Sequence, residues 1–166
     1  MYREIVTKAI IGKGKISNNG EVLISEINDV SKLLGCWVIN HCFVSSFENG
    51  KVFAKGKYDI HLWCGVNGDS DTIIYKKTVD YIEEFSLKLK DEEINENNEY
   101  VIKCAKYPSC NGLVLNEDGV ISVKIEKELN LDIIGETTLK VQISSNKDEW
   151  ISNEDIDNIN VNYLNS

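Results

Sequence analysis

The chain has 166 residues, and 42% of them are apolar, which is enough for a folded core and argues against a disordered chain. Its 18 basic and 27 acidic side chains give a net charge of −9. That charge argues against a nucleic-acid backbone or an anionic membrane as the main partner. With 21 Ile and 14 Val against 3 Ala, the composition favours strands and makes an all-helical fold improbable.

The charge is unevenly distributed along the chain. Residues 1–90 hold 12 basic and 11 acidic side chains, a net charge of +1, whereas residues 91–166 hold 6 and 16, a net charge of −10. A solvated acidic surface that maintains solubility explains this asymmetry. An acidic docking end on a near-neutral body is the alternative interpretation, and both stay open.

Apolar and polar residues alternate in several runs, as they do in antiparallel sheets with one buried face. These runs lie at residues 5–11, 58–64, 72–81, 121–126 and 139–143. The run Lys51–Val66 is followed by Thr72–Leu89, which predicts a hairpin of two long strands. We therefore expect an all-β, antiparallel, sandwich-like fold with few short helices. Its buried positions include Tyr58, Ile60, Leu62 and Val79.

Turn residues that tolerate a positive φ angle separate the predicted strands. They lie at residues 18–20, 48–50, 66–69, 111–112 and 117–119. The segment Ser25–Leu34 places Ile27, Val30 and Leu34 on one helical face, so we also expect a short helix there.

The acidic, Asn-rich segment 91–99 is either a domain linker or a long hairpin loop. We expect one β-rich domain at residues 1–147, with a possible internal boundary at 91–99, and a polar acidic tail at residues 148–166. Tail residues Trp150, Ile151 and Ile156 are apolar anchors among acidic neighbours. No run is apolar enough to span a bilayer, and the N-terminal residues do not resemble a signal peptide, so we expect a cytosolic protein.

Reactive residues are few and show no catalytic spacing. The histidines are His41, next to Cys42, and His61. Neither a phosphate-binding loop, a dinucleotide fingerprint nor a nucleophile elbow is present, and the cysteine spacings do not match a zinc site. We therefore expect no catalytic residue, no cofactor and no metal.

The cysteines divide into two predicted groups. Cys36, Cys64 and Cys104 lie in apolar runs and are expected in the core. Cys110 lies beside Pro108 at a predicted turn, so we expect it to be exposed and able to cross-link. The aromatic residues Trp37, Tyr58 and Trp63 are interpreted either as a sugar-stacking platform or as core and interface residues.

Several segments together resemble a known family. They are Tyr2–Ala9, Leu34–His41, Tyr58–Trp63, Pro108–Cys110 and Ile134–Val141. In this order they resemble the CotE family of outer spore-coat morphogenetic proteins from endospore-forming bacteria. The resemblance covers roughly residues 2–150.

The resemblance implies a non-enzymatic scaffold. Such proteins act in the mother-cell cytoplasm, gather around the forespore, self-associate and recruit outer-coat proteins. The implied partners are therefore the protein itself and other coat proteins, with no nucleic acid and no membrane insertion. In the family an acidic tail recruits clients, and here the tail is short and only moderately acidic. We expect its contacts to involve Trp150, Ile151, Glu154, Asp155, Ile156 and Asp157.

Two other classes of protein fit the residues less well. A β-sandwich carbohydrate-binding module would use Trp37, Tyr58 and Trp63 for stacking. A thiol-dependent enzyme would pair Cys42 with His41.

Overall fold

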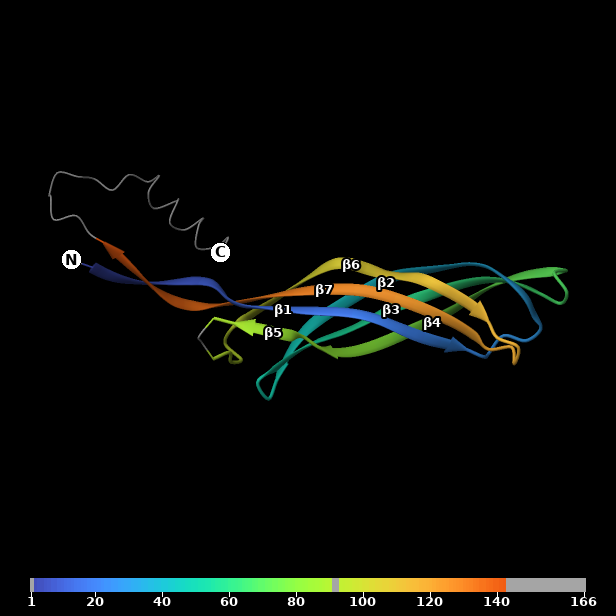
Figure 1. The fold of residues 1–166 in the computed structure, drawn as a ribbon, viewed down its shortest axis with the longest axis horizontal. Helices are drawn as coiled ribbons and strands as arrows, with labels where there is room; N and C mark the ends of the chain where they lie inside the picture. The colour runs from blue at the N-terminus through green and yellow to red at the C-terminus, as the bar shows by residue number, and fades with distance from the viewer. Residues whose placement is uncertain (1, 91–92, 143–166) are drawn as a thin grey trace.

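The computed structural model describes residues 2–90 and 93–142, and each regular element in these ranges is a β-strand (Figure 1). The expectation of an antiparallel all-β fold is confirmed. The strands are β1 (Tyr2–Ile24), β2 (Val30–Glu48), β3 (Lys51–Val66), β4 (Asp71–Glu84), β5 (Ser86–Leu89), β6 (Glu99–Leu115) and β7 (Ile121–Gln142).

The strands form two antiparallel sheets. One has the order β5-β1-β7-β6 and the other the order β2-β3-β4. The predicted hairpin is present as β3 and β4, which pair from Phe53–Glu84 to Val66–Asp71. After β4 the chain crosses to the other sheet, where β5 pairs with residues 12–15 of β1.

Two groups of apolar side chains fill the core. One gathers around Ile60, Leu62, Ile121 and Val123, and the other around Val52, Leu129, Leu131 and Ile133.

The expected burial holds for three of the four positions. Tyr58, Ile60 and Leu62 are buried, whereas Val79 is only half-buried. Val79 lies on β4, which is the edge strand of its sheet, so one flank has no neighbouring strand to cover it.

The expected helix at Ser25–Leu34 is wrong. Residues 25–28 are irregular, and β2 starts at Val30. A helix of ten residues is marginal without good helix formers, and here the side chains find better partners elsewhere. Ile27 is buried in the core, and the Asp29 carbonyl, at a positive φ of 56°, accepts a 3.0 Å hydrogen bond from the Asn67 amide.

Three of the predicted turns are present and two are not. Asn49–Gly50, Asn67–Asp69 and Gly119 have positive φ angles. Residues 18–20 instead continue β1, and residues 111–112 lie in β6 beside a register shift. Pairing of β1 with β7 extends from Tyr2 to Ile24, and this long ladder outweighs the local turn preference of Asn18–Gly20.

Strands from both sides of segment 91–99 share one sheet. β1 and β5 precede the segment, and β6 and β7 follow it. The tail at residues 148–166 lies outside the described residues.

One end of the sheet narrows to a two-stranded ribbon. β1 and β7 extend beyond the other strands toward the N-terminus (Figure 1). β5 joins β1 only at residues 12–15, and β6 begins pairing with β7 at the pair Glu99–Ile134. Residues 2–9 and 135–142 therefore pair only with each other among the described strands, and we call this segment the β1–β7 ribbon.

Candidate interaction surfaces

The outer face of the three-stranded sheet carries a pair of exposed indoles. Trp37 and Trp63 are 50% and 40% exposed, and their ring centroids lie 6.0 Å apart. Ile39 on β2 and Ile74 on β4 are also exposed, and Ile74 pairs directly with Trp63. We call these four residues the outer aromatic patch. Exposed large side chains gathered in this way are typical of an interaction surface.

The third predicted aromatic residue does not join this patch. Even-numbered residues of β3, including Tyr58, point inward, and Tyr58 is only 5% exposed. Trp63 lies on the opposite face of the same strand. The interpretation of all three residues as one stacking platform is therefore wrong, because strand alternation places Tyr58 on the face opposite to Trp63.

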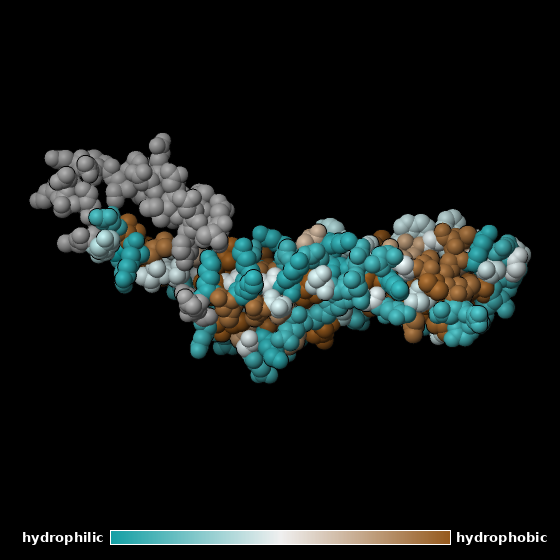
Figure 2. Space-filling view, viewed as in Figure 1, coloured by the Kyte–Doolittle hydropathy of each residue, from teal (hydrophilic) through white to brown (hydrophobic). Residues whose placement is uncertain are grey.

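Hydrophobic and hydrophilic surface alternate along the body. Figure 2 shows hydrophobic surface toward each end of the body, with a broad hydrophilic region between them. Among the described residues, each ion pair other than Lys127–Glu83 has at least one partner that is about half exposed or more, as in Lys15–Glu128 and Lys55–Glu48. Such pairs contribute little to stability but keep the surface solvated.

Between the sheets lies a cluster of polar side chains. Lys127 is 6% exposed, and its Nζ lies 2.7 Å from Glu83 Oε1 and 4.3 Å from the centre of the Tyr81 ring. Asn18 Nδ2 donates a 2.9 Å hydrogen bond to the same carboxylate oxygen. His41 Nε2 lies 2.6 Å from the Tyr81 hydroxyl.

Burial sets the protonation of this cluster. Burial, followed by the positive charge of Lys127, lowers the pKa of His41. Burial, followed by the Glu83 carboxylate, raises the pKa of Tyr81. His41 and Tyr81 thus stay neutral and tie β2 to β4, and Lys127–Glu83 ties β7 to β4.

The sequence contains a signal for this cluster that was missed. Residues 121, 123, 125, 129, 131 and 133 are buried apolar residues of β7. Lys127 has the same parity within this alternating run, so its side chain had to enter the interior. A lysine in a buried strand face requires an anionic partner.

The thiols are arranged differently from the prediction. Cys64 is buried as expected, but Cys36 and Cys104 are half-buried. Cys110 is half-buried rather than exposed, because it packs against the core and its thiol lies next to that of Cys36. Burial, followed by the neighbouring Cys110 thiol, raises the pKa of Cys36 to about 12. The exposed thiol is Cys42.

The geometry gives no support to a pairing of Cys42 with His41. The backbone is irregular here, since Asn40 has a φ of 58° and the register shifts between Ile39 and Cys42. This bulge directs the His41 ring to Tyr81, and Cys42 is left exposed.

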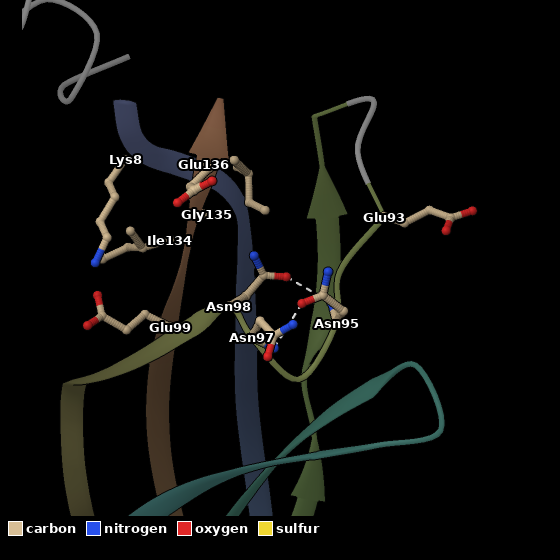
Figure 3. A pocket seen from close by; sticks show the side chains of 10 residues that line it. Lys8, Glu93, Asn95, Asn97, Asn98, Glu99, Ile134, Gly135 and Glu136 are labelled. Atoms are coloured by element: carbon tan, nitrogen blue, oxygen red, sulfur yellow. Dashed lines mark hydrogen bonds between the residues drawn. The ribbon is translucent and has the colours of Figure 1, made fainter. Parts of the chain in front are cut away.

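A polar depression of about 620 Å³ lies at the base of the β1–β7 ribbon (Figure 3). Asn95, Asn97 and Asn98 line it, and they bond to their own loop: the Asn98 side chain accepts from the Asn95 amide, and the Asn95 side chain accepts from the Asn97 amide, each at 2.8 Å. The polar groups of this loop are used to shape the loop itself. No group of metal ligands occurs within residues 2–90 and 93–142.

The β1–β7 ribbon is the second exposed apolar surface. Tyr2, Ile5 and Val6 are 69%, 44% and 66% exposed. Both long edges of the ribbon lack a neighbouring strand among the described residues, so their backbone groups are open to further pairing. The alternation of residues 5–11 predicted a strand here, but not that β1 and β7 extend beyond the neighbouring strands.

The predicted tail contacts, Trp150, Ile151, Glu154, Asp155, Ile156 and Asp157, lie outside the described residues. The predicted Cys110 cross-link stays a prediction.

The described residues thus form an antiparallel all-β fold with two exposed apolar surfaces. The chain matches the family model for outer spore coat protein E (CotE) over residues 1–166, and it belongs to that family. The family is one of structural spore-coat proteins. No curated protein and no solved structure gives a match. The described residues contain no helix that could cross a lipid bilayer.

Proposed function

We propose that this chain is a non-enzymatic morphogenetic scaffold of the spore coat, which self-associates in the mother-cell cytoplasm around the forespore and recruits outer-coat proteins. The observation that carries the proposal is the pair of strand edges on the exposed β1–β7 ribbon, with which no other described strand pairs. Strand edges of this kind are templates for pairing with other chains. Membership of the coat protein family supplies the setting.

Recruitment requires a surface distinct from the one used for self-association. The outer aromatic patch is one candidate, because aromatic side chains dominate binding energy at protein interfaces. The acidic tail is a second candidate, since its apolar residues Trp150, Ile151 and Ile156 would anchor a basic partner surface.

A carbohydrate-binding module is the less favoured function. Of the three aromatic residues considered for sugar stacking, Trp37 and Trp63 are exposed on one face, and their rings are tilted by 32° relative to each other rather than coplanar. Titration of Trp fluorescence with coat polysaccharide distinguishes the two functions. Saturable quenching that is lost in Trp63→Ala would favour the binding module over the scaffold.

The test of the proposal follows a fluorescently tagged copy in sporulating cells. The proposal predicts a shell around the forespore and spores that lack a set of outer-coat proteins when the chain is deleted. A Trp37→Ala/Trp63→Ala variant should still form the shell but lose clients, and Tyr107→Ala, at a 71% exposed position on β6, is the matched control. Diffuse fluorescence throughout the mother cell would contradict the scaffold.

Removal of residues 146–166 tests the tail in the same cells. If the tail recruits clients, the truncated chain folds, forms the shell and loses outer-coat proteins, and Trp150→Ala reproduces most of that loss. If the truncated chain is insoluble or melts many degrees lower, the segment is structural and the docking role is wrong.

A further inference from the structure

Within the ribbon, the edge of β1 that faces away from β7 has a length and a charge pattern that suit pairing with a second copy of itself. Among the described strands, none pairs with this edge from Tyr2 to Ile10, because β5 pairs only at residues 12–15 and the Lys90 amide bonds the Ile11 carbonyl. The unpaired edge thus covers residues 2–10, and its midpoint is Val6. In an antiparallel pair every second residue directs its N–H and C=O to the neighbouring strand, so half of this edge has unused backbone groups.

We propose that this edge pairs antiparallel with the same edge of a second copy, with Val6 opposite Val6 on the two-fold axis. The inference rests on the proposed self-association and names its surface. In this register residue 2 of one copy lies opposite residue 10 of the other. The pairing therefore uses the whole unpaired edge and stops before Gly12, where β5 begins.

The positions of the charged residues independently favour the register centred on Val6. With Val6 on the axis, Glu4 of each copy lies opposite Lys8 of the other, and Ile5 lies opposite Thr7. The ribbon already pairs Glu4 with Lys140 and Lys8 with Glu136 across β1 and β7. The joined four-stranded sheet then has charges that alternate along each row, as Lys140, Glu4, Lys8 and Glu136, with no like charges adjacent.

Other registers are less favourable. A two-fold axis at Glu4 or at Lys8 would place that residue opposite its own copy and bring like charges together, which destabilises a cross-strand pair. The β7 edge has Glu136 and Lys140 around Thr138, but its central positions are threonines. The β1 edge places exposed Ile5 and Val6 at its centre, and β-branched apolar residues pair well across strands.

A charge swap tests the proposed interface. Lys8→Glu places two Glu–Glu contacts in the dimer, and we expect self-association measured by light scattering to weaken by about tenfold or more. Glu4→Lys/Lys8→Glu restores opposite charges between copies while it opposes like charges within the ribbon. Recovery in the double variant therefore identifies contacts between copies, whereas a structural effect within the ribbon would make the double variant worse.

A symmetric cross-link tests the register. In a Cys42→Ser background, Val6→Cys places one thiol on each side of the axis, at a Cα separation that a disulfide spans. We expect a covalent dimer after oxidation, and none with Leu23→Cys, an exposed position at the other end of β1. A dimer formed by Thr138→Cys but not by Val6→Cys would assign the interface to β7 and overturn the proposal.

The two proposals fail in different ways. A wild-type chain that stays monomeric at every concentration overturns the self-association as well as the interface. If the Lys8→Glu variant self-associates as strongly as the wild type and Val6→Cys forms no cross-link, the β1 edge is not the interface. The proposed scaffold function is then unaffected.

Discussion

The phenol of Tyr81 lies across Gly56 on the neighbouring strand, so closely that a Cβ atom on Gly56 would be 2.5 Å from the ring. The same Cβ would lie 2.7 Å from the Cys42 carbonyl, which belongs to the backbone and cannot move aside. The glycine thus lets Tyr81 reach His41 across the three-stranded sheet.

Gly56→Ala should therefore lower the free energy of unfolding by about 1–3 kcal/mol, as overpacked core positions do. Gly35→Ala in the same sheet is the control. The atoms nearest to its Cβ would be those of the Trp37 ring, at an ordinary 3.4 Å or more, so we expect a change below about 0.5 kcal/mol. Urea denaturation measures both variants, and equal effects would contradict the role given to Tyr81.

Lys127→Met should destabilise the protein strongly, because it leaves the Glu83 carboxylate between the sheets without its cation. We expect a loss of about 3 kcal/mol in the free energy of unfolding. The exposed pair Lys15–Glu128 has a similar 2.8 Å separation and is a matched control. Lys15→Met should cost no more than about 1 kcal/mol. A loss of similar size in both variants would show that burial of the pair does not matter.

The stability should depend on pH through His41. Because burial lowers the pKa of His41 in the folded state, the unfolded chain binds the proton more readily. Stability is then present above the ordinary histidine pKa of about 6.5 and is lost as the pH falls below it. Thermal melts of His41→Phe should lose this dependence, whereas His61→Phe on the outer face should keep it. Identical pH profiles for the wild type and His41→Phe would refute this assignment.

The thiols should react in the order of their exposure. We expect native alkylation to label Cys42 at least about tenfold faster than Cys64, which is fully buried, with Cys110 between them. Mass spectrometry of timed samples gives the order. If Cys110 proves to be as protected as Cys64, the predicted cross-link through Cys110 is wrong.

Much of the fold follows from strand alternation. The parity of β3 predicted that Tyr58, Ile60 and Leu62 are buried, and the Asn-Gly sequences predicted the tight turns on either side of it. Local preference failed where long-range pairing competes with it. Asn18–Gly20 has good turn chemistry but lies in a ladder that extends over the whole of β1.

The surfaces were harder to predict than the core. Alternation places Trp37, Tyr58 and Trp63 only relative to their own strands, so the exposed pair of Trp37 and Trp63 required the register of β2 on β3. The free edge of β1 depends on where β5 stops, and no local pattern encodes that position. Local pattern also failed to predict the burial of Cys110, because the thiol beside it, Cys36, belongs to β2 of the other sheet.

The proposed scaffold function requires that this chain assembles with itself. Light scattering after size exclusion, over a concentration range of about a thousandfold, tests the claim most directly. We predict a mass that rises with concentration from the 18.8 kDa of one chain to at least twice that value. A constant mass of 18.8 kDa over the whole range would contradict it.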